Sequence, residues 1–571
     1  MSPALKEHDG ADVPRPWLSR YPRGVPDAVV VPANGVDGMF AAAAKEYRDR
    51  PFLNFRGQRT TYGEAAEQVG RAAAGLRRLG IGPGSRVGLC LPNLPVTVVS
   101  YFAALTAGAT VVNLDPMAAA PQLAHQIADS GTDVVVTVDL QPVFGRIRDA
   151  LSNTGPRHVV VCRMARMLPF PQNIAFRLRE HRRLATLPHD DRIHDFATLA
   201  GEAEGGTTAP AVARPDIAVI QYTGGTTGPP KGAMLSHANL CANALQLRAW
   251  FTKAVPGGER FLAVLPFFHG FGMGAVMNFA VALGAELVIL PRFRPAEALR
   301  AIERARVTIL VGVPALFQAL ADCAAAERTD FSSLKVSVSG GDVLTDALAQ
   351  RFVALTGAPL AEGYGLTECA PVVTCSNPLE GIARPGSCGL PLPGADVVIL
   401  STEPPQRVLP PGEIGEICVR GPQVMRGYWQ QPDATRAVLR GGWLHTGDLG
   451  RIDADGFLYF VSRRPEVIVV RGYKVYARVV EDAIRRHPAV AEVAVVAMPD
   501  PVRGEVPKAF LVLKPGATLD AAGLQAFLRA RLSPVEVPRA CEFRTSLPKS
   551  PFGKVLKHAL SGTPPAAATP S

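Results

Sequence analysis

Helical and strand-like periods of hydrophobic positions alternate along the chain from residue 36 to about residue 315. The segment 60–80 predicts a helix, because Thr61 and Glu64 form a capping-box pattern and Gly80 marks its end. Short apolar runs predict strands at 86–91, 110–114 and 133–139, with helices between them near 96–107 and 122–130. Strands that alternate with helices of this length indicate βαβ units and a mostly parallel sheet.

Two later regions have different patterns. Around 377–428, Pro and Gly recur between short apolar runs, which indicates a smaller β-rich subdomain. After residue 466 the pattern predicts helix, strand, strand and helix at 476–487, 491–498, 508–514 and 519–532. We therefore expect an α/β protein with a large N-terminal region and a small α+β domain at its C-terminal end.

The composition narrows the class of protein. The 571 residues are 47% hydrophobic and 19% charged, which is typical of a globular protein. Nine cysteines are scattered without a C-x-x-C pair, which argues against a disulfide framework and a zinc ribbon. A net charge of +10 favours anionic partners, yet no recognisable nucleic-acid-binding motif accompanies it.

Two apolar stretches, 87–114 and 261–285, are long enough to cross a bilayer and contain no Asp, Glu, Lys or Arg. Prolines and glycines interrupt both of them, so we expect buried α/β core rather than membrane spans. The polar N-terminal segment does not resemble a signal peptide. The expected location is the cytoplasm.

The most informative segment follows the apolar run 217–221 and reads YTGGTTGPPKG from Tyr222 to Gly232. A polyphosphate site needs backbone N–H groups that approach the anion, hydroxyl donors and a cation. Here glycines allow the approach, threonines supply hydroxyls and Lys231 supplies the charge. A Walker A loop has Gly before its Lys, whereas Pro230 stands in that place, so a P-loop ATPase is disfavoured.

Further motifs follow this loop in an order that resembles the adenylate-forming superfamily of acyl-CoA synthetases, adenylation domains and luciferases. They are PFFHG at 266–270, GYGLTE at 363–368, WLHTGD at 443–448, Arg463 with an apolar run to Gly472, and PKSPFGK at 548–554. The segments WLSRYPRGVP, EGYGLTECAP and GPQVMRGYWQQPDAT are most similar to bacterial long-chain fatty acyl-CoA synthetases. The resemblance covers residues 17–560.

The resemblance implies a domain division. A large N-terminal region of several subdomains would occupy 1–462, and a hinge at 463–465 would join it to a mobile C-terminal domain at 466–560. The low-complexity tail 561–571 is expected to be disordered.

The resemblance also implies a two-step reaction. The carboxylate of a medium- or long-chain fatty acid attacks ATP in the presence of Mg²⁺, and pyrophosphate leaves. The thiol of coenzyme A then displaces AMP from the acyl-adenylate. Three alternatives remain open: an acyl-AMP ligase that loads a carrier protein, a dicarboxylate–CoA ligase, and a non-catalytic nucleotide or lipid sensor.

The same resemblance assigns residues to this reaction. Lys554 would bridge the carboxylate and the α-phosphate, Thr367 would contact the α-phosphate, and His269 would lie near the carboxylate. Mg²⁺ would be held by Thr227 and Glu368. ATP binding would use Thr223, Gly224, Gly225, Thr226, Thr227, Gly228, Lys231, Gly341, Glu362, Gly363, Tyr364 and Asp448. Phosphate or coenzyme A contacts would come from Arg463, Gly472, Tyr473 and Lys474.

Two positions depart from the family's pattern. Pro465 stands where the family has an acidic or Lys hinge residue, and Ser462 replaces the usual Asp before Arg463. Proline fixes its own φ and restricts the preceding residue, so we expect a stiffer pivot and a slow thioester step. Met273 stands where some long-chain relatives carry an aromatic gate, which puts that gating device in doubt.

The segment 157–183 carries seven arginines against one acid, with Met, Leu and Phe interleaved. Such a mixture can lie on anionic lipid, so a peripheral contact with the inner face of the membrane competes with a solvated surface insertion. The remaining partner expected is a second copy of the chain, as a homodimer.

Overall fold

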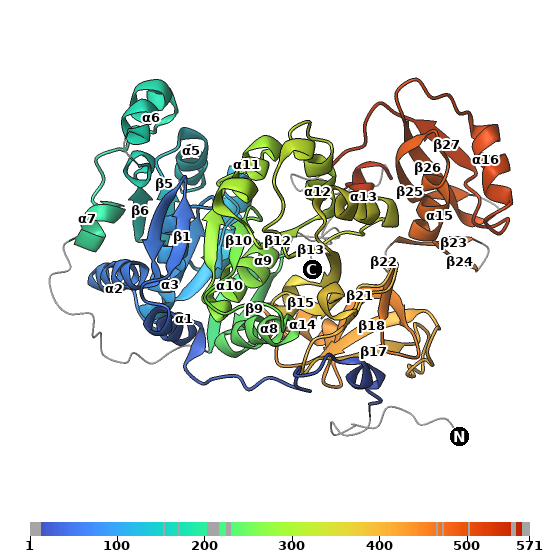
Figure 1. The fold of residues 1–571 in the computed structure, drawn as a ribbon, viewed down its shortest axis with the longest axis horizontal. Coiled ribbons are helices and arrows are strands. Elements are labelled where there is room, and N and C mark those ends of the chain that lie inside the picture. The colour runs from blue at the N-terminus through green and yellow to red at the C-terminus, as the bar shows by residue number, and fades with distance from the viewer. Residues whose placement is uncertain are drawn as a thin grey trace.

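The computed structural model describes residues 13–151, 155–169, 171–201, 216–223, 230–463, 466–470, 473–500, 503–549 and 555–561. Within these residues the strands form four sheets (Figure 1). Two large sheets carry most of the chain, and a third, smaller sheet lies beside them. The fourth sheet belongs to a separate lobe at the C-terminal end, drawn in orange and red.

The first large sheet has parallel pairing through its centre and antiparallel strands at both ends. Its order is β16 (Leu390–Pro391), β15 (Val372–Cys375), β14 (Leu360–Gly365), β13 (Val336–Ser339), β12 (Ile309–Gly312), β10 (Arg260–Ala263), β11 (Glu286–Ile289), β1 (Pro51–Phe55) and β2 (Gln58–Thr61). Apolar side chains cover both faces of the central strands, as parallel sheets require.

The second large sheet is also parallel in its centre. Its order is β19 (Gly427–Tyr428), β9 (Gly232–Ser236), β8 (Ile217–Tyr222), β4 (Thr110–Asn113), β3 (Arg86–Cys90), β5 (Val134–Val138), β6 (His158–Cys162) and β7 (Ile193–Asp195). The antiparallel edge strand β19 comes from a segment nearly two hundred residues after β9. One buried apolar cluster extends through both large sheets.

Helices pack on both sheets. They are α1 (Gly35–Glu46), α2 (Tyr62–Arg78), α3 (Pro95–Thr106), α4 (Ala120–Ser130), α5 (Gln141–Ala150), α6 (Gln172–Glu180), α7 (Phe196–Gly201), α8 (His237–Trp250), α9 (Gly270–Gly272), the π-helical η4 (Met273–Asn278), α10 (Phe279–Leu283), α11 (Pro295–Ala305), α12 (Pro314–Ala321) and α13 (Asp346–Thr356). The predicted capping box of α2 is present, because Thr61 accepts from the N–H of Glu64 and Glu64 accepts from that of Thr61.

Both long apolar stretches belong to this α/β core, as expected. Residues 87–114 form β3, α3 and β4, and residues 261–285 run from β10 through η4 and α10. Among the helices of the described ranges, none is long and apolar enough to cross a membrane. No disulfide joins any of the nine cysteines, all of which lie in described residues.

The β-rich subdomain is antiparallel, with β17 (Asp396–Leu400), β18 (Gly415–Arg420), β21 (Trp443–Ile452), β20 (Leu439–Arg440) and β22 (Leu458–Arg463), and α14 (Pro432–Val438) precedes β20. The N-terminal segment packs on it. Arg15 pairs with Asp396 at 2.6 Å, and Trp17 is buried against Gly456. That contact explains the apolar residues near the start of the chain.

The C-terminal lobe contains the predicted helices and strands, now α15 (Ala477–Arg485), β25 (Val490–Asp500), β26 (Gly504–Leu513) and α16 (Ala521–Arg529). It also contains β23 (Val467–Val470), β24 (Tyr473–Tyr476) and β27 (Ala540–Phe543), which the sequence pattern did not separate. The antiparallel hairpin β23–β24 extends the sheet, and the lobe has its own apolar core.

Candidate active site

The predicted site residues follow strands whose carboxyl ends converge. The glycine-threonine loop follows β8, the PFFHG motif follows β10, Gly341 follows β13, and Thr367 and Glu368 follow β14. Ligands of open α/β sheets bind outside the carboxyl ends of the strands. The two large sheets thus contribute residues to one region.

The glycine-threonine loop joins two antiparallel neighbours, β8 and β9. The N–H of Thr223 donates to the carbonyl of Lys231 over 2.9 Å and closes the base of the loop. Gly224, Gly225, Thr226, Thr227 and Gly228 lie outside the described residues. The expected phosphate-binding role of the loop therefore stays a prediction, although its two ends are fixed.

Glu368 is held by a residue that the sequence did not single out. The hydroxyl of Tyr428 donates to Glu368 Oε1 over 2.7 Å, and burial together with this carboxylate raises the pKa of Tyr428. Lys231 Nζ lies 5.1 Å from the centre of the same ring. Tyr428 therefore contacts both Lys231 and Glu368, the carboxylate that is expected to hold Mg²⁺. A half-buried carboxylate fixed by a hydroxyl is an oxygen ligand suited to that ion.

His269 caps the short helix α9 and faces the same region. Its Nδ1 accepts from the N–H of Phe271 over 3.2 Å, so Nε2 carries the proton of the neutral ring. Neighbouring protein atoms lower the pKa of His269 through desolvation, although the residue itself is exposed to solvent. A Cβ placed on Gly270 would lie 3.7 Å from Thr367 Oγ1, which brings the PFFHG motif beside Thr367. His269 is thus a neutral donor near Thr367.

A buried polar network lies behind His269. Gln221 donates to the carbonyl of Phe268 over 2.9 Å and accepts from Asn113 over 2.8 Å. Asn113 Nδ2 also lies 3.3 Å from the sulfur of Met273, which is fully buried at the start of η4. Met273 is therefore a core residue here, at the position where some relatives carry a gate.

Gly341 and Gly363 lie on a wall of close backbone contacts. Gly341 has φ +78°, a conformation that favours glycine, and it follows Gly340, whose Cβ would meet the ring of Phe271 at 2.9 Å. A Cβ on Gly340 would also meet the carbonyl oxygen of Gly363 at 3.3 Å. A larger side chain at Gly340 would therefore fill the space between Phe271 and Gly363.

Asp448 has a defined orientation. Its Oδ2 accepts from the hydroxyl of Tyr364 over 2.8 Å, and its Oδ1 lies 3.6 Å from Nε of Arg463. Arg463 stands opposite Asp448 in the register of β22 and β21. Burial raises the pKa of Tyr364, which therefore stays a hydroxyl donor. These contacts fix the orientation of the Asp448 carboxylate, which the family resemblance predicts to bind the ribose of ATP.

Hydrogen bonds also fix Thr446 and Gly447, the two residues before Asp448. The N–H of Gly447 donates to Glu416 Oε1 over 3.2 Å. Thr446 donates to the carbonyl of Ile417 over 2.8 Å and accepts from the N–H of Asp448 over 3.1 Å. Glu416 and Thr446 were not identified from the sequence, because both contacts depend on the register of β18 and β21.

The C-terminal residues are only partly described. Gly472, Pro465 and Lys554 lie outside the described residues, and of Tyr473 only the backbone is described, at the start of β24. Lys474 donates to Glu403 over 2.7 Å and to Thr402 over 2.8 Å, which are residues of the β-rich subdomain. In this conformation Lys474 therefore links the two lobes.

Glu362 is the most perturbed carboxyl group of the region. Burial raises its pKa from 4.5 to about 7, although the N–H of Leu344 donates to it over 3.3 Å and Arg478 lies near. Between pH 4.5 and pH 7 the unfolded chain releases this proton while the folded chain keeps it. Stability is therefore lost as pH rises through this window, by about 3 kcal/mol in full.

Glu362→Gln is expected to remove this loss, because the amide oxygen still accepts from Leu344 and cannot ionise. The variant should unfold at a higher temperature than the wild type at pH 8 and at nearly the same temperature at pH 5. Thermal unfolding at the two pH values measures the difference. An equal difference at both values would contradict the raised pKa.

Comparisons with known proteins show the family of this chain. The family model described as AMP-binding enzyme matches residues 40–429, and the model of its C-terminal domain matches residues 479–554. The long-chain-fatty-acid–CoA ligase of Bacillus subtilis is 39% identical over 96% of this chain and 97% of its own length. The ligase of the same name from Escherichia coli is 37% identical over 95% and 97%.

The fold comparison gives the same result. The crystal structure of ATP-bound MatB from Rhodopseudomonas palustris superposes with a TM-score of 0.81 and 28% identity, over 92% of this chain and 98% of that one. The two family models together match most of the chain, and the fold comparison covers nearly all of it. The protein belongs to the AMP-binding enzyme family.

Proposed function

We propose that the protein joins a medium- or long-chain fatty acid to coenzyme A through an acyl-adenylate, with ATP and Mg²⁺. The observation that carries the proposal is that His269, Thr367 and Glu368, which follow β10 and β14 of the first large sheet, lie beside the end of β8 in the second. The substrate class follows from relatives that are named long-chain-fatty-acid–CoA ligases and align over nearly their full length.

The first step brings a carboxylate and a triphosphate together, so positioning and charge neutralisation dominate it. Lys231 lies at the base of the phosphate loop, and Lys554 would bridge the reacting groups. The neutral ring of His269 can donate from Nε2 to the fatty acid carboxylate without adding a charge. Asp448 accepts the ribose hydroxyls, with its orientation set by Tyr364.

Mg²⁺ would be held by Glu368, with Thr227 as the second protein ligand. When bound, it supplies positive charge to the phosphate oxygens. Tyr428 fixes the orientation of the Glu368 carboxylate through its hydrogen bond to Oε1. Glu362, Gly363 and Tyr364 would frame the adenine, and Gly341 would line the nucleotide pocket.

The second step depends on the C-terminal lobe. Arg463, Gly472, Tyr473 and Lys474 would contact coenzyme A or its phosphates after the lobe turns at 463–465. Lys474 would first have to leave Glu403 and Thr402, an exposed pair whose rupture costs at most about 1 kcal/mol. The division into 1–462, 463–465 and 466–560 is part of this proposal.

Pro465→Lys is expected to raise the rate of thioester formation about threefold, because it restores backbone freedom at the pivot. Pyrophosphate release in the absence of coenzyme A should not change. The two half-reactions are measured separately, with acyl-adenylate supplied for the second. An unchanged thioester rate would reject the stiffened pivot.

One assay separates the proposal from its alternatives. Pyrophosphate release and thioester formation are followed across saturated fatty acids and dicarboxylic acids, with and without coenzyme A. The proposed ligase forms both products with monocarboxylic acids of medium or long chain. Pyrophosphate without thioester indicates a carrier-protein-loading enzyme, a preference for dicarboxylic acids indicates the second alternative, and ATP binding without either product indicates a sensor.

A peripheral membrane contact through 157–183 is a further part of the proposal. Helix α6 exposes Ile174 and Leu178, with 49% and 71% of their surface in solvent. Arg163 and Arg166 both pair with Asp195, which leaves them less available to lipid. Co-sedimentation with anionic vesicles at low and high salt tests the lipid contact, on which the expected location at the inner membrane face depends. Light scattering of the purified protein tests the homodimer.

A further inference from the structure

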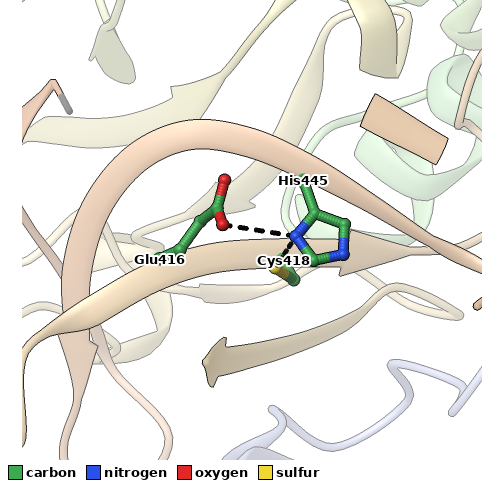
Figure 2. A group of neighbouring side chains, drawn as sticks. All are labelled: Glu416, Cys418 and His445. Carbon is green, nitrogen blue, oxygen red and sulfur yellow. Dashed lines mark hydrogen bonds and ion pairs between the residues drawn. The ribbon is translucent and has the colours of Figure 1, made fainter. Parts of the chain in front are cut away.

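Three metal-binding side chains meet in the β-rich subdomain, near Asp448 but outside the site described above. Glu416 and Cys418 lie two residues apart on β18, so they share one face of the sheet. Cys418 stands opposite His445 of β21 in the strand register. Figure 2 shows the three side chains pointing toward one another. Their exposed fractions are 3%, 0% and 7%.

The distances suit a shared cation. His445 Nδ1 lies 3.2 Å from Glu416 Oε2 and 3.4 Å from Cys418 Sγ, and the three ligand atoms lie within 4.8 Å of one another. Ligand atoms around a tetrahedral Zn²⁺ ion are about 3.3–3.7 Å apart, given metal–ligand distances of about 2.0–2.3 Å. Small rotations of the three side chains would therefore bring their ligand atoms to the separations of a tetrahedral Zn²⁺ site.

Nδ1 of His445 lies beside both the Glu416 carboxylate and the Cys418 thiol. Nδ1 carries either one proton or one lone pair, so it cannot donate fully to a carboxylate and accept from a thiol at the same time. A cation between the three groups accepts a lone pair from each of them. This is the physical reason to prefer a metal ion over a hydrogen-bonded cluster.

The chemistry of the donors selects the kind of ion. Sulfur and imidazole favour Zn²⁺ and similar ions, whereas Mg²⁺ and Ca²⁺ prefer oxygen. As a neutral thiol, Cys418 carries one proton on its sulfur. Binding replaces that proton, which passes to solvent, and the thiolate and carboxylate then balance the two charges of the ion.

We propose that Glu416, Cys418 and His445 bind one Zn²⁺ ion, with water as the fourth ligand. The ion joins β18 to β21 three residues before Asp448. Glu416 also accepts from the N–H of Gly447, so the ion supports the loop that carries the ribose carboxylate. This site is separate from the Mg²⁺ ligand Glu368 and does not depend on the proposed reaction.

The test uses the full-length protein, freed of metal by mild chelation and dialysis. Zn²⁺ is added in small excess and removed by gel filtration, and the bound metal is counted by mass spectrometry. We expect about one Zn²⁺ per chain. Co²⁺ titration should give an intense near-ultraviolet thiolate-to-metal band and visible bands of tetrahedral Co²⁺. A wild-type protein that binds less than a tenth of an equivalent and gives no thiolate band would overturn the proposal.

Cys418→Val locates the site, because valine keeps the apolar volume on the strand and removes the sulfur. It should lose the thiolate band and bind Zn²⁺ at least tenfold more weakly. Cys375→Val is the matched control, since Cys375 is also a fully buried strand cysteine, on β15. A band that persists in Cys418→Val, or disappears equally in Cys375→Val, would refute the assignment.

Discussion

Replacing Glu368 with glutamine is expected to lower the rate of pyrophosphate release by about a hundredfold or more. Glutamine has nearly the same shape, and its carbonyl oxygen can still accept from Tyr428, so the local structure is preserved. The variant loses the negative charge that would hold Mg²⁺ at the phosphates. Removing one group that stabilises transition-state charge typically costs a factor of about 10²–10³. The rate is measured with saturating ATP over a range of Mg²⁺ concentrations.

Tyr428→Phe is the companion variant. It leaves the charge of Glu368 in place and removes the hydrogen bond that orients the carboxylate, which is worth about 1.5–3 kcal/mol for a charged acceptor. We expect a loss of about tenfold in rate and a higher Mg²⁺ concentration at half-maximal activity. Full activity of Glu368→Gln at ordinary Mg²⁺ would show that another residue holds the ion.

Local signals in the sequence predicted much of the fold. The capping box at Thr61 and Glu64 marked the start of α2, and the strand runs after it formed the parallel sheet. The position of the glycine-threonine loop also followed from local order, because the loop directly succeeds the apolar run 217–221, which forms β8. Local propensity and hydrophobic period suffice for features of this kind.

Contacts between distant segments could not be predicted in this way. Tyr428 meets Glu368 because the short edge strand β19 pairs with β9, and a two-residue strand leaves no periodic signal. The cluster of Glu416, Cys418 and His445 depends on the register of two antiparallel strands, which a shift of one residue would reverse. Single-sequence patterns contain no information on either pairing.

Lys554→Ala is expected to abolish adenylate formation and to leave thioester formation from supplied acyl-adenylate largely intact. A positive charge about 4 Å from the reacting carboxylate and phosphate is worth roughly 4 kcal/mol at an effective dielectric constant of 20. That energy corresponds to about a thousandfold loss of rate. Pyrophosphate release and single-turnover thioester formation are measured side by side, and ATP binding is measured by calorimetry. An equal loss in both half-reactions would contradict the assigned role.

The structure supplies the control for this variant. Lys549 lies on the same segment, but its Nζ already pairs with Glu492 at 2.7 Å, and Lys557 pairs with Glu466 and Glu481. Lys549 and Val555 also form a backbone bridge at the base of the intervening segment, which an alanine at 549 would keep. Lys549→Ala removes only an exposed ion pair worth less than about 1 kcal/mol and should change neither half-reaction by more than about twofold. A large loss in this variant as well would assign the effect to the basic segment as a whole rather than to the charge of Lys554.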